Sequence, residues 1–238
     1  AAGSNPAGSV FYEDKYMRAV KLYFSKQKKI EDYGFIFFLI GIFFLPSTIL
    51  IGIIFLLPAF IISSFSSNKP LFKDYWNYSY LILGLLIILS AILQNYLLTN
   101  NYSEIWDTKL SLIGLGNWIP LIWVFGASQP YLNSKSKRRS FSLILVAGSL
   151  PILITGFGQY FFNWNGPFET LNGLIIWYQK PIKNPGGLSG LFSNQNYAAS
   201  WLNFVWPFCI ALFIEKGSNL FKKTVTLGFL ISTGLAAF

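Results

Sequence analysis

The chain has 238 residues, of which 53% are hydrophobic, 19% are aromatic and only 11% are charged. Soluble domains carry about a quarter charged residues, so this composition excludes an ordinary soluble enzyme and predicts a membrane protein. The formal charge of +9 does not indicate a nucleic-acid-binding protein, because only three residues are arginine and the lysines cluster beside apolar runs, as the positive-inside rule expects.

The first 33 residues are predicted to form a cytoplasmic segment ahead of the membrane domain. Residues 1–9 are small and polar, and residues 10–30 alternate lysines with aromatic and apolar side chains at roughly helical spacing. This alternation predicts an amphipathic helix on an anionic membrane surface, and a solvated basic tail is the alternative. No signal peptide is visible, because the first apolar run starts only near Gly34.

The first apolar block, Gly34–Ser63, is interrupted in its middle by Leu45-Pro46-Ser47-Thr48. Proline removes a backbone donor and disfavours a helical conformation at the residue before it. The lysine-rich N-terminus, together with Lys69 and Lys73, places both ends of the block in the cytoplasm, so the block crosses the membrane twice or not at all. We therefore predict a helical hairpin that turns at Pro46.

Later apolar runs complete an all-α fold, a polytopic transmembrane helix bundle over residues 34–238. Loops 127–140 and 215–224 are basic and are predicted to face the cytoplasm, which places loop 159–196 outside. The last run reaches Phe238 with no terminal charge or tail, which favours the N-terminal part of a longer protein. The later predicted spans are Tyr75–Tyr96, Leu110–Gly126, Phe141–Gly158, Tyr197–Ile214 and a run from about Val225.

The outward loop 159–196 is less polar than most loops. Its Asn163–Pro167 stretch is typical of a turn. The next stretch, Phe168–Tyr178, is predicted to form an interfacial or re-entrant helix at the depth of the lipid headgroups. Trp164 and Trp177 suit that depth as ordinary interfacial anchors, which is the alternative to any role in binding.

Candidates for acid–base chemistry and for metal binding are scarce. Glu169 is the only acid in the outward loop and is therefore its candidate catalytic carboxylate. Histidine is absent, and the single cysteine, Cys209, lies inside an apolar run. Neither an internal disulfide nor a metal site is expected, and no cofactor is implied.

Lys180 and Lys183 lie next to a glycine-rich stretch that includes Gly187 and Gly190, just ahead of a predicted helix. Exposed backbone N–H groups and the positive end of a helix dipole favour anions at such a place. The stretch is therefore a candidate anion site, and solvated surface lysines are the alternative.

The helix predicted from Tyr197 carries a polar stripe on an apolar background. Asn194 or Asn196 can cap its N-terminus, and Asn196, Ser200 and Asn203 share one helical face. Polar groups that face lipid are costly, so we expect the stripe to face the protein interior or a wet cavity. Hydrogen bonding between helices, without a substrate, is the alternative. The polar residues expected near the same outer side are Gln94, Asn117 and Gln159.

Residues 190–198, Gly-Leu-Phe-Ser-Asn-Gln-Asn-Tyr-Ala, match the G-x-F-x-N-x-N-x-A signature that precedes a membrane span in the O-antigen ligase and O-antigen polymerase family. From about residue 34 to residue 238, the chain resembles cyanobacterial-type members of that family. The supporting features are Gly166-Pro167, Gly173–Ile175, Asn117–Leu121 and the Leu45-Pro46 break.

The resemblance implies an all-helical, GT-C-like glycosyltransferase of the bacterial inner membrane, acting in lipopolysaccharide or polysaccharide biosynthesis. Such proteins move a glycan from an undecaprenyl-diphosphate carrier to a lipid or glycan acceptor on the periplasmic side, without a metal. The family uses arginines, some of them in a later periplasmic loop that this chain lacks. No arginine lies in the outward loop of this chain. Lys180 or Lys183 would therefore have to hold the diphosphate. The candidate substrate-binding residues are then Lys180, Lys183, Gly190, Asn194, Gln195, Asn196, Ser200 and Asn203.

Two other functions stay open at this point. The first is a component of a transporter for a small anion such as bicarbonate. Against it, the predicted spans show no intramembrane charge pair and no inverted repeat of the kind that transporters often have. A non-catalytic membrane scaffold is the other. Loss of glycan transfer on substitution of Lys180 and Lys183 would favour the transferase, and loss of uptake with unchanged surface glycans would favour the transporter.

Overall fold

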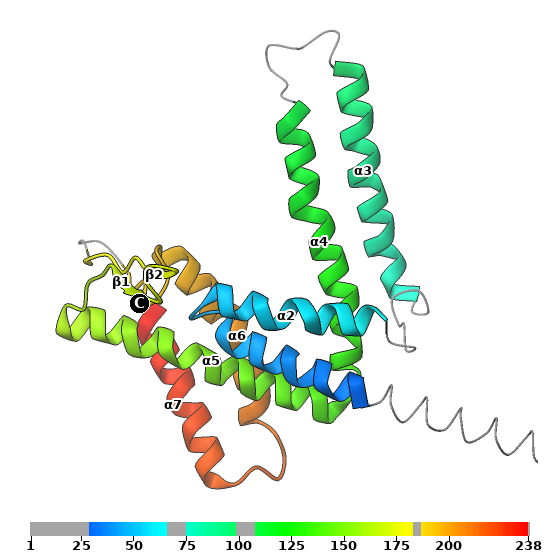
Figure 1. Ribbon diagram of the computed structural model, residues 1–238. Coiled ribbons are helices and arrows are strands. Elements are labelled where there is room, and N and C mark those ends of the chain that lie inside the picture. The colour runs from blue at the N-terminus through cyan, green and yellow to red at the C-terminus, as the bar shows by residue number, and fades with distance from the viewer. Residues whose placement is uncertain (1–28, 66–74, 99–107, 183–186, 238) are drawn as a thin grey trace, which may run out of the picture. The chain divides into compact units, whose positions relative to one another are not determined.

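The computed structural model describes residues 29–65, 75–98, 108–182 and 187–237 (Figure 1). The described residues fall into two compact units. Unit 1 takes the described residues within 1–35 and 60–130, and unit 2 takes those within 36–59 and 131–238. The amphipathic helix predicted over residues 10–30 lies, up to residue 28, outside the described residues.

The described chain is mostly helical, as predicted, because its long apolar runs favour helices over strands. Its elements are a helix over residues 29–44, α2 (Ile49–Ser64), the short 3-10 helix η2 (Tyr75–Asn77), α3 (Tyr78–Leu98), α4 (Thr108–Leu132), α5 (Lys135–Phe162), β1 (Phe168–Thr170), β2 (Ile175–Trp177), α6 (Gln195–Phe213) and α7 (Leu220–Ala237). Among the described helices, α5 is the one that is long and apolar enough to cross a membrane by length and composition.

The helical conformation of the first apolar block is interrupted at Pro46, where the sequence predicts a turn. The helix over residues 29–44 gives way to a turn over residues 45–47, and α2 follows. Pro46 has no N–H with which to continue the first helix. Thr48 instead closes the turn by donating its N–H to Phe44 O at 2.7 Å.

The two helices of this hairpin pack closely. Gly41 faces Leu56 so tightly that a Cβ on Gly41 would lie 2.5 Å from Leu56 Cγ. Nearer the open end, the rings of Phe37 and Phe55 lie with their centroids 6.0 Å apart. A glycine at the contact allows the two backbones to approach, as in other close helix pairs.

In unit 2, α5 contacts both α6 and α7 (Figure 1). Gly148 of α5 lies directly against the backbone of Phe43, near the end of the first helix of the hairpin. The next residue, the buried Ser149, accepts a hydrogen bond from Trp201 Nε1 of α6 at 2.9 Å. The hairpin and α6 therefore both pack against the middle of α5.

In unit 1, α3 and α4 lie side by side (Figure 1). The rings of Tyr80 and Phe125 stack with their centroids 4.1 Å apart. The side-chain amides of Asn77 and Gln129 exchange two hydrogen bonds, of 3.2 and 2.8 Å. Many large apolar side chains of α3 are nevertheless exposed, Leu85 among them. An apolar surface of this extent indicates contact with lipid or with another protein.

The helix predicted over Phe168–Tyr178 is wrong, because this stretch forms an antiparallel hairpin of β1 and β2. Phe168 pairs with Trp177, and Thr170 pairs with Ile175. The chain reverses through Leu171, Asn172 and Gly173, all three with positive φ. Asn-Gly is a strong hairpin signal, and the flanking aromatic and β-branched residues favour strands. The apolar content of the stretch did not distinguish a helix from strands, and the turn residues favour the hairpin.

The basic segment 127–140, predicted as a loop, is mostly helical. α4 continues to Leu132, and α5 starts at Lys135. Ser134 separates them as the N-cap of α5, with its Oγ accepting the N–H of Lys137 at 3.2 Å. Serine at this position satisfies a backbone donor that the helix leaves free, so a short polar break is enough to divide the two helices.

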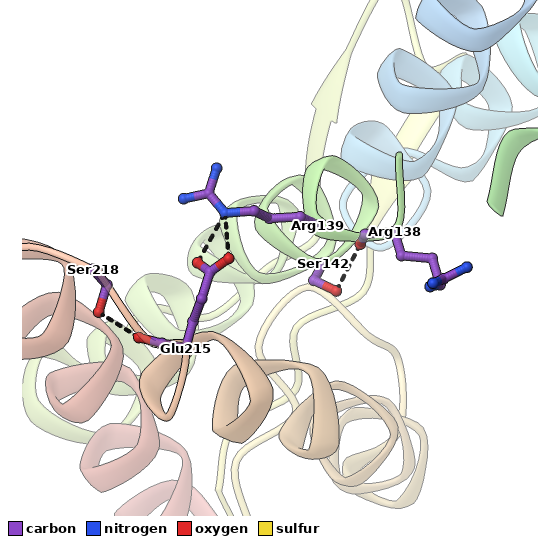
Figure 2. Close-up of polar contacts among 5 residues, drawn as sticks. All are labelled: Arg138, Arg139, Ser142, Glu215 and Ser218. Carbon is purple, nitrogen blue, oxygen red and sulfur yellow. Dashed lines mark hydrogen bonds and ion pairs between the residues drawn. The ribbon is translucent and has the colours of Figure 1, made fainter. Parts of the chain in front are cut away.

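An ion pair joins the first turns of α5 to the segment that connects α6 and α7 (Figure 2). Arg139 Nε donates to both carboxylate oxygens of Glu215, at 2.9 and 2.8 Å. The hydrogen bonds from Arg139 hold the pKa of the Glu215 carboxyl below its ordinary value of 4.5, and the nearby charges of Lys135 and Lys222 lower it further. The pair fixes where α6 ends relative to α5.

We expect the Arg139–Glu215 pair to make the stability of unit 2 depend on pH. Because the pKa of Glu215 is lower in the folded chain, its contribution is complete above the ordinary value of 4.5 and is lost as the pH falls through the folded pKa. Glu215→Gln should therefore flatten the acid side of the curve of unfolding midpoint against pH, measured in detergent. Arg139→Gln should flatten it less, because Lys135 and Lys222 still lower the pKa of Glu215. Two variants that both follow the wild-type curve would contradict the assignment.

Candidate functional site

The loop between α5 and α6, predicted to face outward, is fastened to the C-terminal part of α5 by one buried amide. Gln159 Nε2 donates to Lys180 O at 2.5 Å and to Ser189 Oγ at 3.1 Å. Its Oε1 accepts the N–H groups of Ser189 at 2.9 Å and Gly190 at 3.3 Å. Gln159 is 3% exposed, so a side chain predicted to join a polar stripe instead uses its whole amide to hold the loop.

A second buried glutamine ties the β-hairpin to the same helix. Gln179, just after β2, is 1% exposed, and its Nε2 donates to Thr155 O at 2.8 Å. Its backbone O accepts the N–H of Gly166 at 2.8 Å, which closes the base of the hairpin. Its side-chain Oε1 is buried and has no hydrogen-bond partner within the described part of the chain. Such an atom is costly to leave unpaired.

The start of α6 uses two of the three predicted amides for structure. Asn194 is the N-cap, with its side-chain oxygen accepting the N–H of Asn196 at 2.8 Å. Gln195 Oε1 accepts the N–H of Gly187 at 2.6 Å and so closes the loop over the first turn. The capping role predicted for Asn194 is confirmed. The side chain of Asn196 makes no hydrogen bond with any described residue, and it alone is left to meet a ligand.

Gly190 also has a structural reason to be glycine. Its φ is +54°, and a Cβ there would lie 2.7 Å from Ile152 O of α5. Positive φ is unfavourable for residues with a Cβ, and the neighbouring backbone leaves no room for one. Gly190 therefore lets the loop lie directly on α5.

These residues surround a cavity of about 200 Å³ between the loop, α5 and α6. Its walls combine small and apolar side chains with two amides and the backbone of the glycine loop. Four of the nine signature residues, Gly190, Gln195, Asn196 and Ala198, line it. The remaining lining residues are Ile152, Leu153, Gly156, Gly187, Leu188, Ala199, Leu202 and Ala236.

The polar stripe was predicted to face the protein interior or a wet cavity, and only Asn196 of its three residues borders a cavity. Ser200 and Asn203 are exposed on α6, and Asn196 is exposed where it borders the cavity. The buried face of α6 is instead Ala198, Leu202, Val205, Cys209 and Leu212. The packing of α6 on α5 and α7 selects small and apolar residues, so the polar face is left outside.

The predicted charged residues are not brought together at the cavity. Glu169 lies exposed on β1, and Lys180 is exposed as well, with only its backbone O held by Gln159. Lys183 lies outside the described residues. Gln94 and Asn117 are exposed on helices of unit 1. None of the described lining residues of the cavity is titratable, so the cavity can bind a polar group through amides and backbone but supplies no acid or base.

Comparison with known proteins finds no matching family model, no similar curated protein and no similar solved structure. Among the described residues, no group of three or more histidine, cysteine, aspartate or glutamate side chains gathers where a metal ion could be held. The site is thus defined by its own geometry, a neutral cavity beneath a loop that two buried glutamines fix to one helix.

Proposed function

We propose that the chain is an O-antigen ligase-like glycosyltransferase in a polytopic helix bundle of the bacterial inner membrane. One observation carries this proposal. Four residues of the G-x-F-x-N-x-N-x-A signature, Gly190, Gln195, Asn196 and Ala198, line a single cavity together with residues of α5. Capping of α6 accounts for Asn194 and does not account for the presence of Gly190, Asn196 and Ala198 at the same cavity.

The remaining features fit a membrane-embedded, glycan-handling protein. The apolar length of α5 and the exposed apolar surface of α3 suit a lipid environment. Backbone N–H groups and amides suit the neutral and anionic oxygens of a polyprenyl-diphosphate-linked sugar. Lys180 would then approach the diphosphate from the exposed side of the loop. Lys183, proposed for the same role, lies outside the described residues. Glu169 or a group supplied elsewhere would accept the proton of the acceptor hydroxyl.

Asn196 and Asn203 provide a matched pair of substitutions for testing this function. Asn196→Leu should lower glycan transfer about tenfold, because it removes the free amide of the cavity. Asn203→Leu, the same change on an exposed position of the same helix that does not line the cavity, should leave transfer near the wild-type level. Transfer is measured as the amount of acceptor glycosylated from an undecaprenyl-diphosphate-linked donor, at equal amounts of inserted protein.

Two results would count against the transferase. If Asn196→Leu and Asn203→Leu both left glycan transfer unchanged, the cavity would have no part in it. If Asn196→Leu abolished uptake of a small anion such as bicarbonate while surface glycans were unchanged, the transporter would be the better description.

A further inference from the structure

A second cavity, of about 540 Å³, lies between the C-terminal end of α5 and the β-hairpin. Its composition differs from that of the first cavity, because three of its walls are aromatic rings and three of its polar side chains are amides. The lining residues are Thr155, Asn163, Trp164, Asn165, Phe168, Trp177, Gln179 and Leu191. None carries a charge, so the cavity is suited to a neutral polar ligand and not to a phosphate.

The aromatic rings are held in place but stay accessible. Trp164 rests directly on Gly158 of α5, where any Cβ would collide with the indole, and lies 6.0 Å from the ring of Phe162 between centroids. Trp164 is nevertheless 44% exposed, and Phe168 is 42% exposed. Trp177 is fixed at its other edge, because its Nε1 donates to Ser47 O at 2.6 Å. An indole whose N–H is committed to the protein is not free for the lipid headgroups.

The polar groups of this cavity have unused hydrogen-bonding capacity. The side-chain amides of Asn163 and Asn165 make no hydrogen bond with any described residue, although both residues line the cavity. Asn163 is held in the left-handed conformation, at φ 52°, as the C-cap of α5, so its position is set by the helix end. Gln179 adds a side chain whose Oε1 lacks a partner among the described residues. Amides offer donors and acceptors together.

We propose that this aromatic and amide cavity binds one sugar ring of a glycan. A pyranose presents a C–H face that packs on an indole or phenyl ring and a rim of hydroxyls that both donate and accept hydrogen bonds. Fixed aromatic walls with a few amides are the matching surface, and the volume is within the range of small-molecule sites. The inference rests on the proposed function for the source of the sugar, which is the lipid-linked or acceptor glycan that an outward loop would meet.

Binding can be tested by saturation-transfer NMR on the full chain in nanodiscs. The probes are the methyl glycosides of glucose, galactose, mannose and N-acetylglucosamine. We expect saturable transfer to the ring C–H protons of at least one of them. Trp164→Leu should weaken it about tenfold, and Asn165→Ala should weaken it while leaving the aromatic walls intact. Trp118→Leu is the matched control, because Trp118 is an exposed tryptophan of α4 that does not line the cavity.

The outcomes separate this inference from the proposed function. No saturation transfer from the wild-type chain to any probe, or equal loss in the Trp164 and Trp118 variants, would overturn sugar binding even if glycan transfer is confirmed. Loss of membrane insertion in Trp164→Leu with an unchanged NMR signal would make Trp164 an anchor and would also overturn it. A saccharide signal that persists in Asn196→Leu, together with normal glycan transfer in that variant, would support this cavity and count against the first.

Discussion

Replacing Gln159 with leucine should release the loop between α5 and α6 from α5 while the helices stay folded. The substitution keeps the bulk of the side chain but removes the partners of Lys180 O and of the N–H groups of Ser189 and Gly190. A buried polar group left unpaired costs about 1–3 kcal/mol, so losing several at once favours local opening. Amide hydrogen exchange over residues 187–192 should accelerate about 100-fold or more, and glycan transfer should fall with it.

The neighbouring residue Tyr160 supplies the control for this experiment. Tyr160 is 63% exposed on the same turn of α5, so Tyr160→Leu should leave exchange in the loop unchanged. Gln195→Leu should give a smaller increase than Gln159→Leu, because Gln195 holds the loop through the N–H of Gly187 alone. Equal exchange rates in the wild type and in Gln159→Leu would mean that the loop is held by its other contacts.

The positions of the helices followed from local properties of the sequence. Long apolar runs marked where helices form, and Pro46 marked a break, because a proline lacks the N–H that a helix needs whatever surrounds it. Asn194 was one of two predicted caps of α6. It could be predicted because capping involves only residues a few positions apart. Features that depend on nearest neighbours along the chain were therefore predictable.

The directions in which side chains face were not predictable in the same way. Asn196, Ser200 and Asn203 do share a face of α6, but which face is buried depends on how α6 meets α5 and α7. The spacing of residues on a helix gives the relative angle between side chains and not the direction of the core. The same limit applies to Gln159, whose partners lie 21 to 31 positions away.

The β-hairpin could have been found from the sequence. Asn172-Gly173 between β-branched and aromatic residues is a short-range signal, and the residues named above pair across it as that signal expects. The helical interpretation rested on the apolar and aromatic content of the stretch, which is equally typical of strands. Because of that error the aromatic cavity was not predicted, since Phe168 and Trp177 of the hairpin form two of its walls.

A single methyl group at Gly148 should separate the N-terminal hairpin from α5. The Cβ of an alanine there would lie 2.5 Å from Phe43 O and 3.0 Å from Phe43 Cα, and backbone atoms cannot turn aside as a side chain can. Overpacking of this kind costs about 1–3 kcal/mol and outweighs the gain of up to about 1 kcal/mol from replacing a helical glycine with alanine. We expect Gly148→Ala to lower the unfolding midpoint in detergent by several degrees.

Gly228→Ala is the control that shows whether the lower unfolding midpoint of Gly148→Ala comes from the contact with Phe43 or from replacing a helical glycine with alanine. Gly228 lies in α7, and a Cβ there would meet nothing within 4 Å, so Gly228→Ala should raise the unfolding midpoint slightly or leave it unchanged. Opposite signs in the two variants would show that close packing of the hairpin on α5 stabilises unit 2. If both variants moved the midpoint in the same direction, the contact of Gly148 with Phe43 would contribute little to that stability.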